Sequence, residues 1–167
     1  MRLHGVKLIA FDADGTLRRC TVAGQHFPCA AGEWEILPGV REKLASIDWG
    51  TVGFGVASNQ GGVAAGMLSE PVARSLLIDM ARDALSLVPG MQTCFRPPLP
   101  MGFIQLCPHG SGEVCACRKP MPGMLRRIMA FYDVRSTETL FVGNADTDMQ
   151  AAANAGCRFS WAREFFS

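Results

Sequence analysis

The sequence lacks an excess of charge of either sign, because 16 lysines and arginines stand against 15 aspartates and glutamates in 167 residues. A net charge of about +1 provides no overall attraction to nucleic acid or to an anionic membrane. Tyrosine and tryptophan are also scarce, with one and three residues. These two deficits argue against a nucleic-acid-binding protein and leave only a local basic patch to be considered.

Long apolar runs are missing as well. The N-terminal stretch MRLHGVKLIAFDADG is interrupted by acidic residues too soon to be a signal peptide or a membrane span. We therefore expect a cytoplasmic protein with no membrane contact. The length, with 49% hydrophobic residues, suits a single domain over residues 1–167, and we expect a monomer.

The seven cysteines are an odd number, and the Cys-x-x-Cys pattern of thioredoxin-like redox sites is absent. Three of them join a histidine in the pattern Cys-x-His-x₅-Cys-x-Cys, and a disulfide here would leave the histidine and one cysteine without a role. Such donors build closed tetrahedral zinc sites, in which four protein ligands leave no position for water. The pattern predicts a structural zinc ion in a loop over 107–117, held by Cys107, His109, Cys115 and Cys117.

Short apolar segments alternate with helical patterns along the chain. This alternation predicts a three-layer, Rossmann-like α/β/α fold with a central parallel sheet. Residues 17–37 have no sustained period, and we expect a long loop or small flap there. The expected strands are 6–14, 51–59, 103–107, 139–144 and 157–162, and the expected helices are 37–47, 69–88, 122–132 and 147–156.

Polar residues follow several of these strands, at ends that meet on one edge of a parallel sheet. Asp12 and Asp14 suit a nucleophile and a second acid beside a hard cation, although a capped turn would also explain them. Ser58 offers a hydroxyl group and a backbone N–H to an anion, and Asn59 and Gln60 extend the set of donors. Ordinary loop chemistry is the plainer interpretation of that second group.

Two further groups lie later in the chain. Arg118 and Lys119 precede an expected helix and could form a phosphate site, although a solvated basic pair is the commoner case. Asn144, Asp146 and Asp148 follow the strand over 139–144, and helix capping would explain one of them.

In this order, Asp12-x-Asp14-Gly15-Thr16, Ser58, Lys119 and Gly143-Asn144-x-Asp146-x-Asp148 resemble the motifs of the haloacid dehalogenase (HAD) superfamily of phosphohydrolases. The resemblance implies that Asp12 attacks phosphorus and forms an aspartyl-phosphate. It implies that Asp14 protonates the leaving oxygen and then activates water. Ser58 and Lys119 would hold the oxygens of the transferring phosphoryl group.

The same resemblance implies a catalytic Mg²⁺ ion bound by Asp12, the backbone carbonyl of Asp14, Asn144 and Asp148. Family members usually have Gly-Asp where this chain has Gly143-Asn144, so a neutral ligand replaces an anionic one. We expect Asp148 to compensate, with Asp146 as the alternative.

The stretches CPHGSGEVCACRKP and SNQGG resemble the small zinc-containing HAD branch without a cap domain. That branch contains D-glycero-D-manno-heptose 1,7-bisphosphate phosphatases and histidinol-phosphate phosphatases. It implies the four zinc ligands named above and Arg118 as a contact to a substrate phosphate. Heptose phosphatases usually read Asp-Arg-Asp-Gly-Thr, whereas this chain has Ala13 between the two acids.

The favoured function is a Mg²⁺-dependent phosphomonoesterase acting on a small phosphorylated metabolite, foremost a sugar phosphate such as D-glycero-D-manno-heptose 1,7-bisphosphate. Histidinol phosphate is the first alternative. A polynucleotide 3′-phosphatase is the second, and a non-catalytic, zinc-stabilised binding domain is the last. The DNA alternative would use a stripe of basic residues, namely Arg18, Arg19, Arg96, Arg118 and Lys119.

Overall fold

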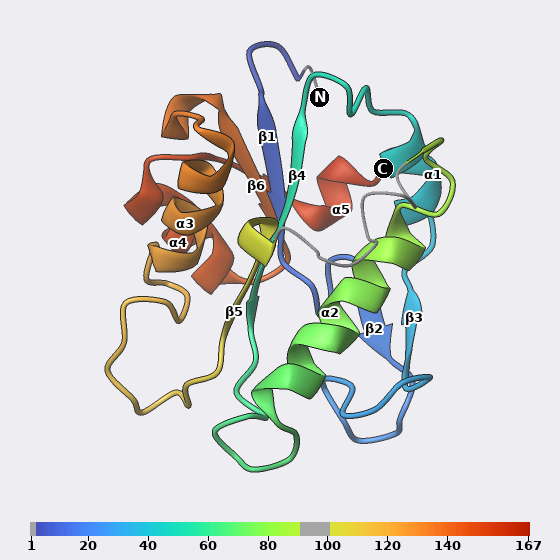
Figure 1. Ribbon diagram of the computed structural model, residues 1–167, viewed down its shortest axis with the longest axis vertical. Helices are drawn as coiled ribbons and strands as arrows, with labels where there is room; N and C mark the ends of the chain where they lie inside the picture. Colours follow the sequence, from blue (N-terminus) through green and yellow to red (C-terminus); the bar gives the residue numbers. More distant parts are fainter. Residues whose placement is uncertain (1–2, 91–100) are drawn as a thin grey trace.

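The computed structural model describes residues 3–90 and 101–167, and its centre is a five-stranded parallel sheet (Figure 1). The strand order is β5-β4-β1-β6-β7. The central strand, β1, is the apolar run LIAF, and all four of its residues are buried because helices cover both faces of the sheet. The strands are β1 (Leu8–Phe11), β4 (Gly53–Asn59), β5 (Ile104–Cys107), β6 (Thr139–Gly143) and β7 (Arg158–Trp161).

In the part of the chain that the structure describes, five α-helices lie on the two faces of this sheet, as Figure 1 illustrates. Successive residues of β1 point to opposite faces, so Ile9 and Phe11 join one core and Leu8 and Ala10 the other. The first core includes α1 (Val40–Ala45), α2 (Glu70–Ala84) and α5 (Ala162–Phe165), and the second includes α3 (Gly123–Tyr132) and α4 (Asp146–Ala155). The predicted α/β/α arrangement is confirmed. Two 3₁₀ turns, η2 (Met101–Phe103) and η3 (Ser136–Glu138), precede β5 and β6.

Residues 17–37 are more regular than the sequence predicts. They contain a two-stranded antiparallel pair, β2 (Arg18–Cys20) and β3 (Trp34–Ile36), in place of an irregular flap. The segment between these strands packs on the loop after β4, where the Phe27 ring lies so close to Gly62 that a Cβ would not fit. This hairpin therefore stands beside the carboxyl ends of the sheet strands (Figure 1).

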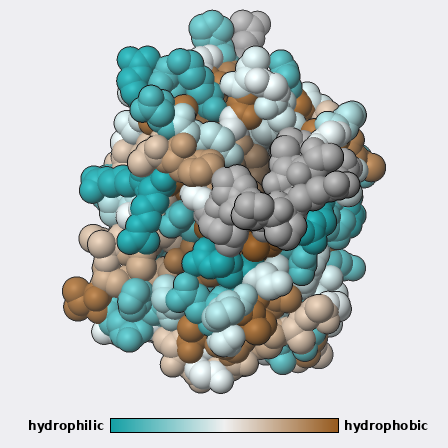
Figure 2. Space-filling model, viewed as in Figure 1, coloured by the Kyte–Doolittle hydropathy of each residue, from teal (hydrophilic) through white to brown (hydrophobic). Residues whose placement is uncertain are grey.

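Apolar and polar side chains are intermixed on the face shown in Figure 2. Within residues 3–90 and 101–167, no helix has both the length and the apolar character needed to cross a membrane. Arg96, one member of the candidate basic stripe, lies outside the described residues.

Candidate active site

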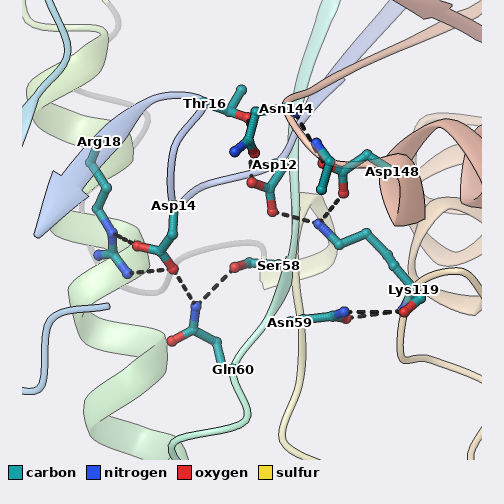
Figure 3. Close-up of polar contacts among 11 residues, drawn as sticks. Asp12, Asp14, Thr16, Arg18, Ser58, Asn59, Gln60, Lys119, Asn144 and Asp148 are labelled. Atoms are coloured by element: carbon teal, nitrogen blue, oxygen red, sulfur yellow. Dashed lines mark hydrogen bonds and ion pairs between the residues drawn. The ribbon is translucent and has the colours of Figure 1, made fainter. Parts of the chain in front are cut away.

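The carboxyl ends of β1, β4 and β6 and the segment after β5 surround a cavity of about 190 Å³ (Figure 3). Parallel strands bring these ends to one edge of the sheet. Asp146 is not among the lining residues and is exposed on the first turn of α4. The cavity is lined by Asp12, Asp14, Ser58, Asn59, Lys119, Asn144, Ala145, Thr147 and Asp148.

A buried ion pair lies at the base of this cavity. Lys119 Nζ is 2.5 Å from Asp12 Oδ1 and 2.7 Å from Asp148 Oδ1. Burial raises the pKa of Asp12 to about 6, and the negative charge of Asp148 adds to this rise, whereas Lys119 opposes it. Burial alone would lower the pKa of Lys119, but the two carboxylates raise it. Lys119 is therefore held as a cation next to Asp12.

Asp148 is held from both sides. Its Oδ2 accepts hydrogen bonds from the backbone N–H groups of Asn144 (3.1 Å) and Ala145 (3.0 Å), and its Oδ1 faces Lys119. The sequence predicts Asp148 as a magnesium ligand, and this stays a prediction; in the structure its oxygens also face these protein groups. Its visible role is to fix Lys119 and the turn that follows β6.

Asn59 and Gln60 also bind protein groups, although the sequence predicts that they contact substrate. Asn59 Nδ2 donates to the Lys119 carbonyl oxygen (3.2 Å), and the Lys119 N–H donates to Asn59 Oδ1 (2.9 Å). Gln60 Nε2 donates to Asp14 Oδ2 (3.0 Å) and to Ser58 Oγ (2.8 Å). Asn59 therefore orients the Lys119 backbone, and Gln60 orients the side chains of Asp14 and Ser58 (Figure 3).

Arg18 is the residue that sequence reasoning misplaces. The sequence assigns it to an exposed basic stripe, but the structure buries it completely, with Nε 2.7 Å from Asp14 Oδ1. It is therefore not available to a nucleic-acid backbone, and that part of the stripe is wrong. The one local feature of the sequence that could have indicated this burial is the spacing of four residues from Asp14, because a turn can bring two such residues into an ion pair.

The donor set fits a hard divalent cation. Three carboxylates, on Asp12, Asp14 and Asp148, face only two cations, Lys119 and Arg18, so the cluster carries an excess negative charge. Carboxylate and carbonyl oxygens are the ligands that Mg²⁺ prefers.

Asn144 stands close to the turn after β1. Thr16 Oγ1 donates to Asn144 Oδ1 (3.1 Å), and the Asn144 amide lies so near Gly15 that a Cβ would clash with it. Gly15 has φ +86°, a conformation that glycine adopts without strain. The turn thus brings the Asn144 amide oxygen to the edge of the Asp12 carboxylate.

The second candidate centre is the Cys/His group. The ligand atoms of its four members lie within 4.8 Å of one another, and the contacts among their sulfur and nitrogen atoms run from 3.2 to 3.8 Å. Two sulfur atoms bound to one tetrahedral zinc ion at about 2.3 Å would lie about 3.8 Å apart. The described cysteines are all free, so no disulfide competes for these sulfurs. The group consists of Cys107, His109, Cys115 and Cys117.

Arg118 connects the Cys/His group to the cavity at the strand ends. Its backbone N–H donates to Cys115 Sγ (3.3 Å), which lowers the pKa of that thiol, and its Nη1 donates to the His109 carbonyl oxygen (2.8 Å). Its side chain also lines a second, open cavity of about 570 Å³ that shares Asn59, Lys119 and Thr147 with the first. The loop geometry therefore determines where Arg118 and Lys119 stand.

Residues 116–163 match the model of the HAD-hydrolase-like family. The chain is 37% identical over 155 residues to D-glycero-beta-D-manno-heptose-1,7-bisphosphate 7-phosphatase of Bordetella bronchiseptica, covering 91% of this chain and 78% of that protein. The corresponding enzyme of Pseudomonas putida is 32% identical, with 92% and 80% coverage. D-glycero-alpha-D-manno-heptose-1,7-bisphosphate 7-phosphatase of Mycobacterium tuberculosis is 28% identical, with 86% and 70% coverage.

A solved structure is similar over nearly the whole chain. The crystal structure of D,D-heptose 1,7-bisphosphate phosphatase from B. bronchiseptica, complexed with magnesium and phosphate, aligns with a TM-score of 0.72 and 34% identity. The alignment covers 92% of this chain and 79% of that one.

Proposed function

This chain belongs to the HAD-like hydrolases, in the family of the heptose-bisphosphate phosphatases, and on that premise we propose that it removes the 7-phosphate from D-glycero-beta-D-manno-heptose 1,7-bisphosphate. The observation that carries the proposal is the pairing of Asp12 with Lys119 at the base of a cavity that Asp14 and Ser58 also line. The beta anomer is preferred because the relatives named for it are the more similar ones.

Asp12 is the nucleophile in this proposal. Its carboxylate attacks phosphorus, the bond from phosphorus to the sugar oxygen breaks, and Asp14, which takes up a proton before this step, passes that proton to the oxygen. Water then attacks the aspartyl-phosphate and loses a proton to Asp14, which releases phosphate and restores both acids. Lys119 balances the charge of the phosphoryl oxygens. Gln60 donates to Ser58 Oγ, so the Ser58 hydroxyl hydrogen can point to a phosphoryl oxygen.

We propose that Mg²⁺ is held by the Asp12 carboxylate, the Asp14 backbone carbonyl and the Asn144 amide oxygen. When bound, the ion offsets the negative charge that gathers on the transferring group. The neighbouring structure complexed with magnesium and phosphate supports this cofactor. Asp148 acts on the site through Lys119 and the backbone of Asn144.

The metal proposed for the Cys/His group is zinc, in a structural role. Four protein donors complete a tetrahedral shell, and two of them, Cys107 and Cys117, are buried, which leaves no open position for a substrate.

Arg118 and the 570 Å³ cavity would receive the rest of the substrate, with the guanidinium group facing the phosphate that is retained. Such an open cavity suits a sugar with a second anionic group. We propose that the protein acts as a monomer in the cytoplasm on this small metabolite.

The test is a substrate panel with Mg²⁺, in which phosphate release is measured and the product is identified by ³¹P NMR. The panel contains the two anomers of the heptose bisphosphate, histidinol phosphate and a 3′-phosphorylated oligonucleotide. We expect the highest kcat/KM for the beta bisphosphate, with loss of the 7-phosphate. Higher kcat/KM for histidinol phosphate or for the oligonucleotide would contradict the proposed substrate. No Mg²⁺-dependent release from any of them would contradict the proposed activity.

Magnesium binding should depend on pH through Asp12. Because the pKa of this carboxyl is raised from 3.8 to about 6, protons compete with the cation below that pH, and affinity should fall about tenfold per pH unit there. In the metal-free protein, the stabilisation from the raised pKa is present below the unfolded value and lost as pH rises through about 6.

The measurement is the rise in Tm on adding Mg²⁺, followed between about pH 5 and pH 8. We expect the rise to grow with pH and to level off above the pKa of Asp12. In Asp12→Asn this pH dependence should disappear. An equal rise in Tm across the whole range in the wild-type protein would contradict the role given to Asp12.

Asn144→Asp should tighten magnesium binding, because it adds a formal negative charge to an oxygen ligand. We expect the Mg²⁺ concentration that gives half-maximal activity to fall about tenfold. The control is Gln150→Glu, which adds the same charge to an exposed position of α4. A fall of the same size in the control would show a general charge effect, and an unchanged value in Asn144→Asp would remove Asn144 from the ligand set.

A further inference from the structure

Arg18 is a cation with no exposed surface. Nε lies 2.7 Å from Asp14 Oδ1, Nη2 donates to Asp14 Oδ2 (3.5 Å), and Nη1 donates to the Leu76 carbonyl oxygen (3.1 Å). Removing a guanidinium group from water is unfavourable unless its donors find partners, and apolar replacements of buried ion pairs are often as stable. The burial of Arg18 is therefore weak evidence for a role in stability alone.

The backbone of Arg18 belongs to the same turn as the carboxylate that it binds. The Arg18 N–H donates to the Ala13 carbonyl oxygen (3.1 Å), and the Gly15 N–H donates to the Arg18 carbonyl oxygen (2.8 Å). Arg18 also pairs with Ile36 across the hairpin, while its side chain reaches α2 at Leu76. The backbone of Arg18 is thus fixed by the turn and by β3, and its guanidinium group is also held by α2.

Asp14 depends on these contacts for its orientation. Its side chain is 18% exposed at the cavity, and Gln60 is the only further side-chain donor that contacts it among the described residues. An aspartate at a cavity mouth can adopt several rotamers. The fork of Arg18 on one side and Gln60 on the other holds both carboxylate oxygens in place (Figure 3).

We propose that Arg18 is a positioning residue that holds Asp14 where it can protonate the leaving oxygen of the substrate. This inference rests on the proposed function. In the step concerned, the bond from phosphorus to the sugar oxygen breaks as the proton of Asp14 passes to that oxygen, leaving an alcohol and a carboxylate. Arg18 touches neither the phosphate nor the sugar, and it exchanges no proton.

The test compares two esters with different leaving groups. The heptose bisphosphate releases an alkoxide and needs the proton, whereas 4-nitrophenyl phosphate releases a stable phenolate and needs it far less. The parameter is kcat/KM, which covers the steps up to departure of the leaving group when that departure is irreversible. The variants are Arg18→Met, which keeps the apolar stem, and Arg18→Lys, which keeps the charge without the fork.

We expect Arg18→Met to lower kcat/KM about 100-fold for the sugar ester and by less than about threefold for the nitrophenyl ester. Arg18→Lys should restore part of the difference. Arg41→Met is the matched control, because Arg41 also binds α2 through Asp83 (2.7 Å) but lies away from the cavity. It should affect neither ester selectively.

A double-mutant cycle with Asp14→Asn guards against loss of fold. If Arg18 acts through Asp14, Arg18→Met should cause little further loss for the sugar ester in the Asp14→Asn background. Equal losses for both esters, or losses that simply multiply in the double mutant, would overturn the inference and indicate a structural role. A wild-type protein that turned over neither ester would overturn the proposed function, and this inference with it.

Discussion

Asp12→Asn should abolish phosphate release, with kcat reduced by about 10⁴-fold or more, because an amide cannot form the acyl-phosphate bond. The substitution should not lower the Tm of the metal-free protein. Asn keeps the shape, and its oxygen can still accept from Lys119 Nζ, which also keeps its second carboxylate at 2.7 Å. The Asn Nδ2 can donate to Thr16 Oγ1, because that hydroxyl group can donate to Asn144 Oδ1. Burial also disfavours the ionised form of the Asp12 carboxyl, as its raised pKa indicates, and the substitution removes this penalty.

The control for this result is Asp79→Asn, which removes a carboxylate from a surface ion pair with Arg82. Its activity should equal that of the wild-type protein, since exposed pairs contribute little. Purified Asp12→Asn that kept more than about one hundredth of the wild-type kcat would refute Asp12 as the nucleophile. Measurement of phosphate release and of Tm on the same preparation separates lost chemistry from lost fold.

Cys117→Ser should remove the metal ion from the Cys/His group and reduce both stability and activity. Metal binding orders a loop that has no regular secondary structure between β5 and α3, so we expect Tm to fall by about 10 °C or more. Arg118 contacts Cys115 and His109 directly, and a displacement of about 1 Å there can reduce kcat/KM about 100-fold.

The matched control is Cys157→Ser, because Cys157 is a free cysteine that contacts Met129 of α3 and is not a member of the Cys/His group. It should retain the metal ion and kcat/KM. Metal content is measured by elemental analysis, with one zinc per chain expected in the wild-type protein and none in Cys117→Ser. A metal-free Cys117→Ser variant with undiminished kcat/KM would contradict the prediction that the order of this loop supports activity.

The positions of Asp12 and Asp14 were predictable because they follow a buried apolar strand, and strand ends in a parallel sheet share an edge. The partners of Asn59 were not predictable. An amide at a strand end can face a ligand or a backbone, and here the choice depends on Lys119, sixty positions away in the chain. Sequence patterns report the local period of a segment and carry little information about such distant contacts.

Arg18 is a second residue whose contacts the local sequence pattern does not reveal. Its neighbours in sequence are a leucine and a second arginine, and of the two arginines only Arg19 is exposed. The difference arises because β2 turns one side chain toward α2 and Asp14 and the other toward solvent, where Arg19 pairs with Glu35. Side chains alternate between the two sides of a strand, but this alternation could be applied to Arg18 and Arg19 only once residues 17–37 were known to form a hairpin.

The strand order of the sheet also bears on how the chain folds as it is made. Leu8 of β1 pairs with Gly53 of β4 on one side and with Thr139 of β6 on the other. During synthesis from the N-terminus, β1 therefore presents one unpaired, apolar edge until β6 has left the ribosome. Nascent chains that stop before Gly143 should remain open to chaperones or to aggregation, since such an edge accepts other strands. The turn after β1 is therefore synthesised early, but its contact with Asn144 can form only after β6 has been made.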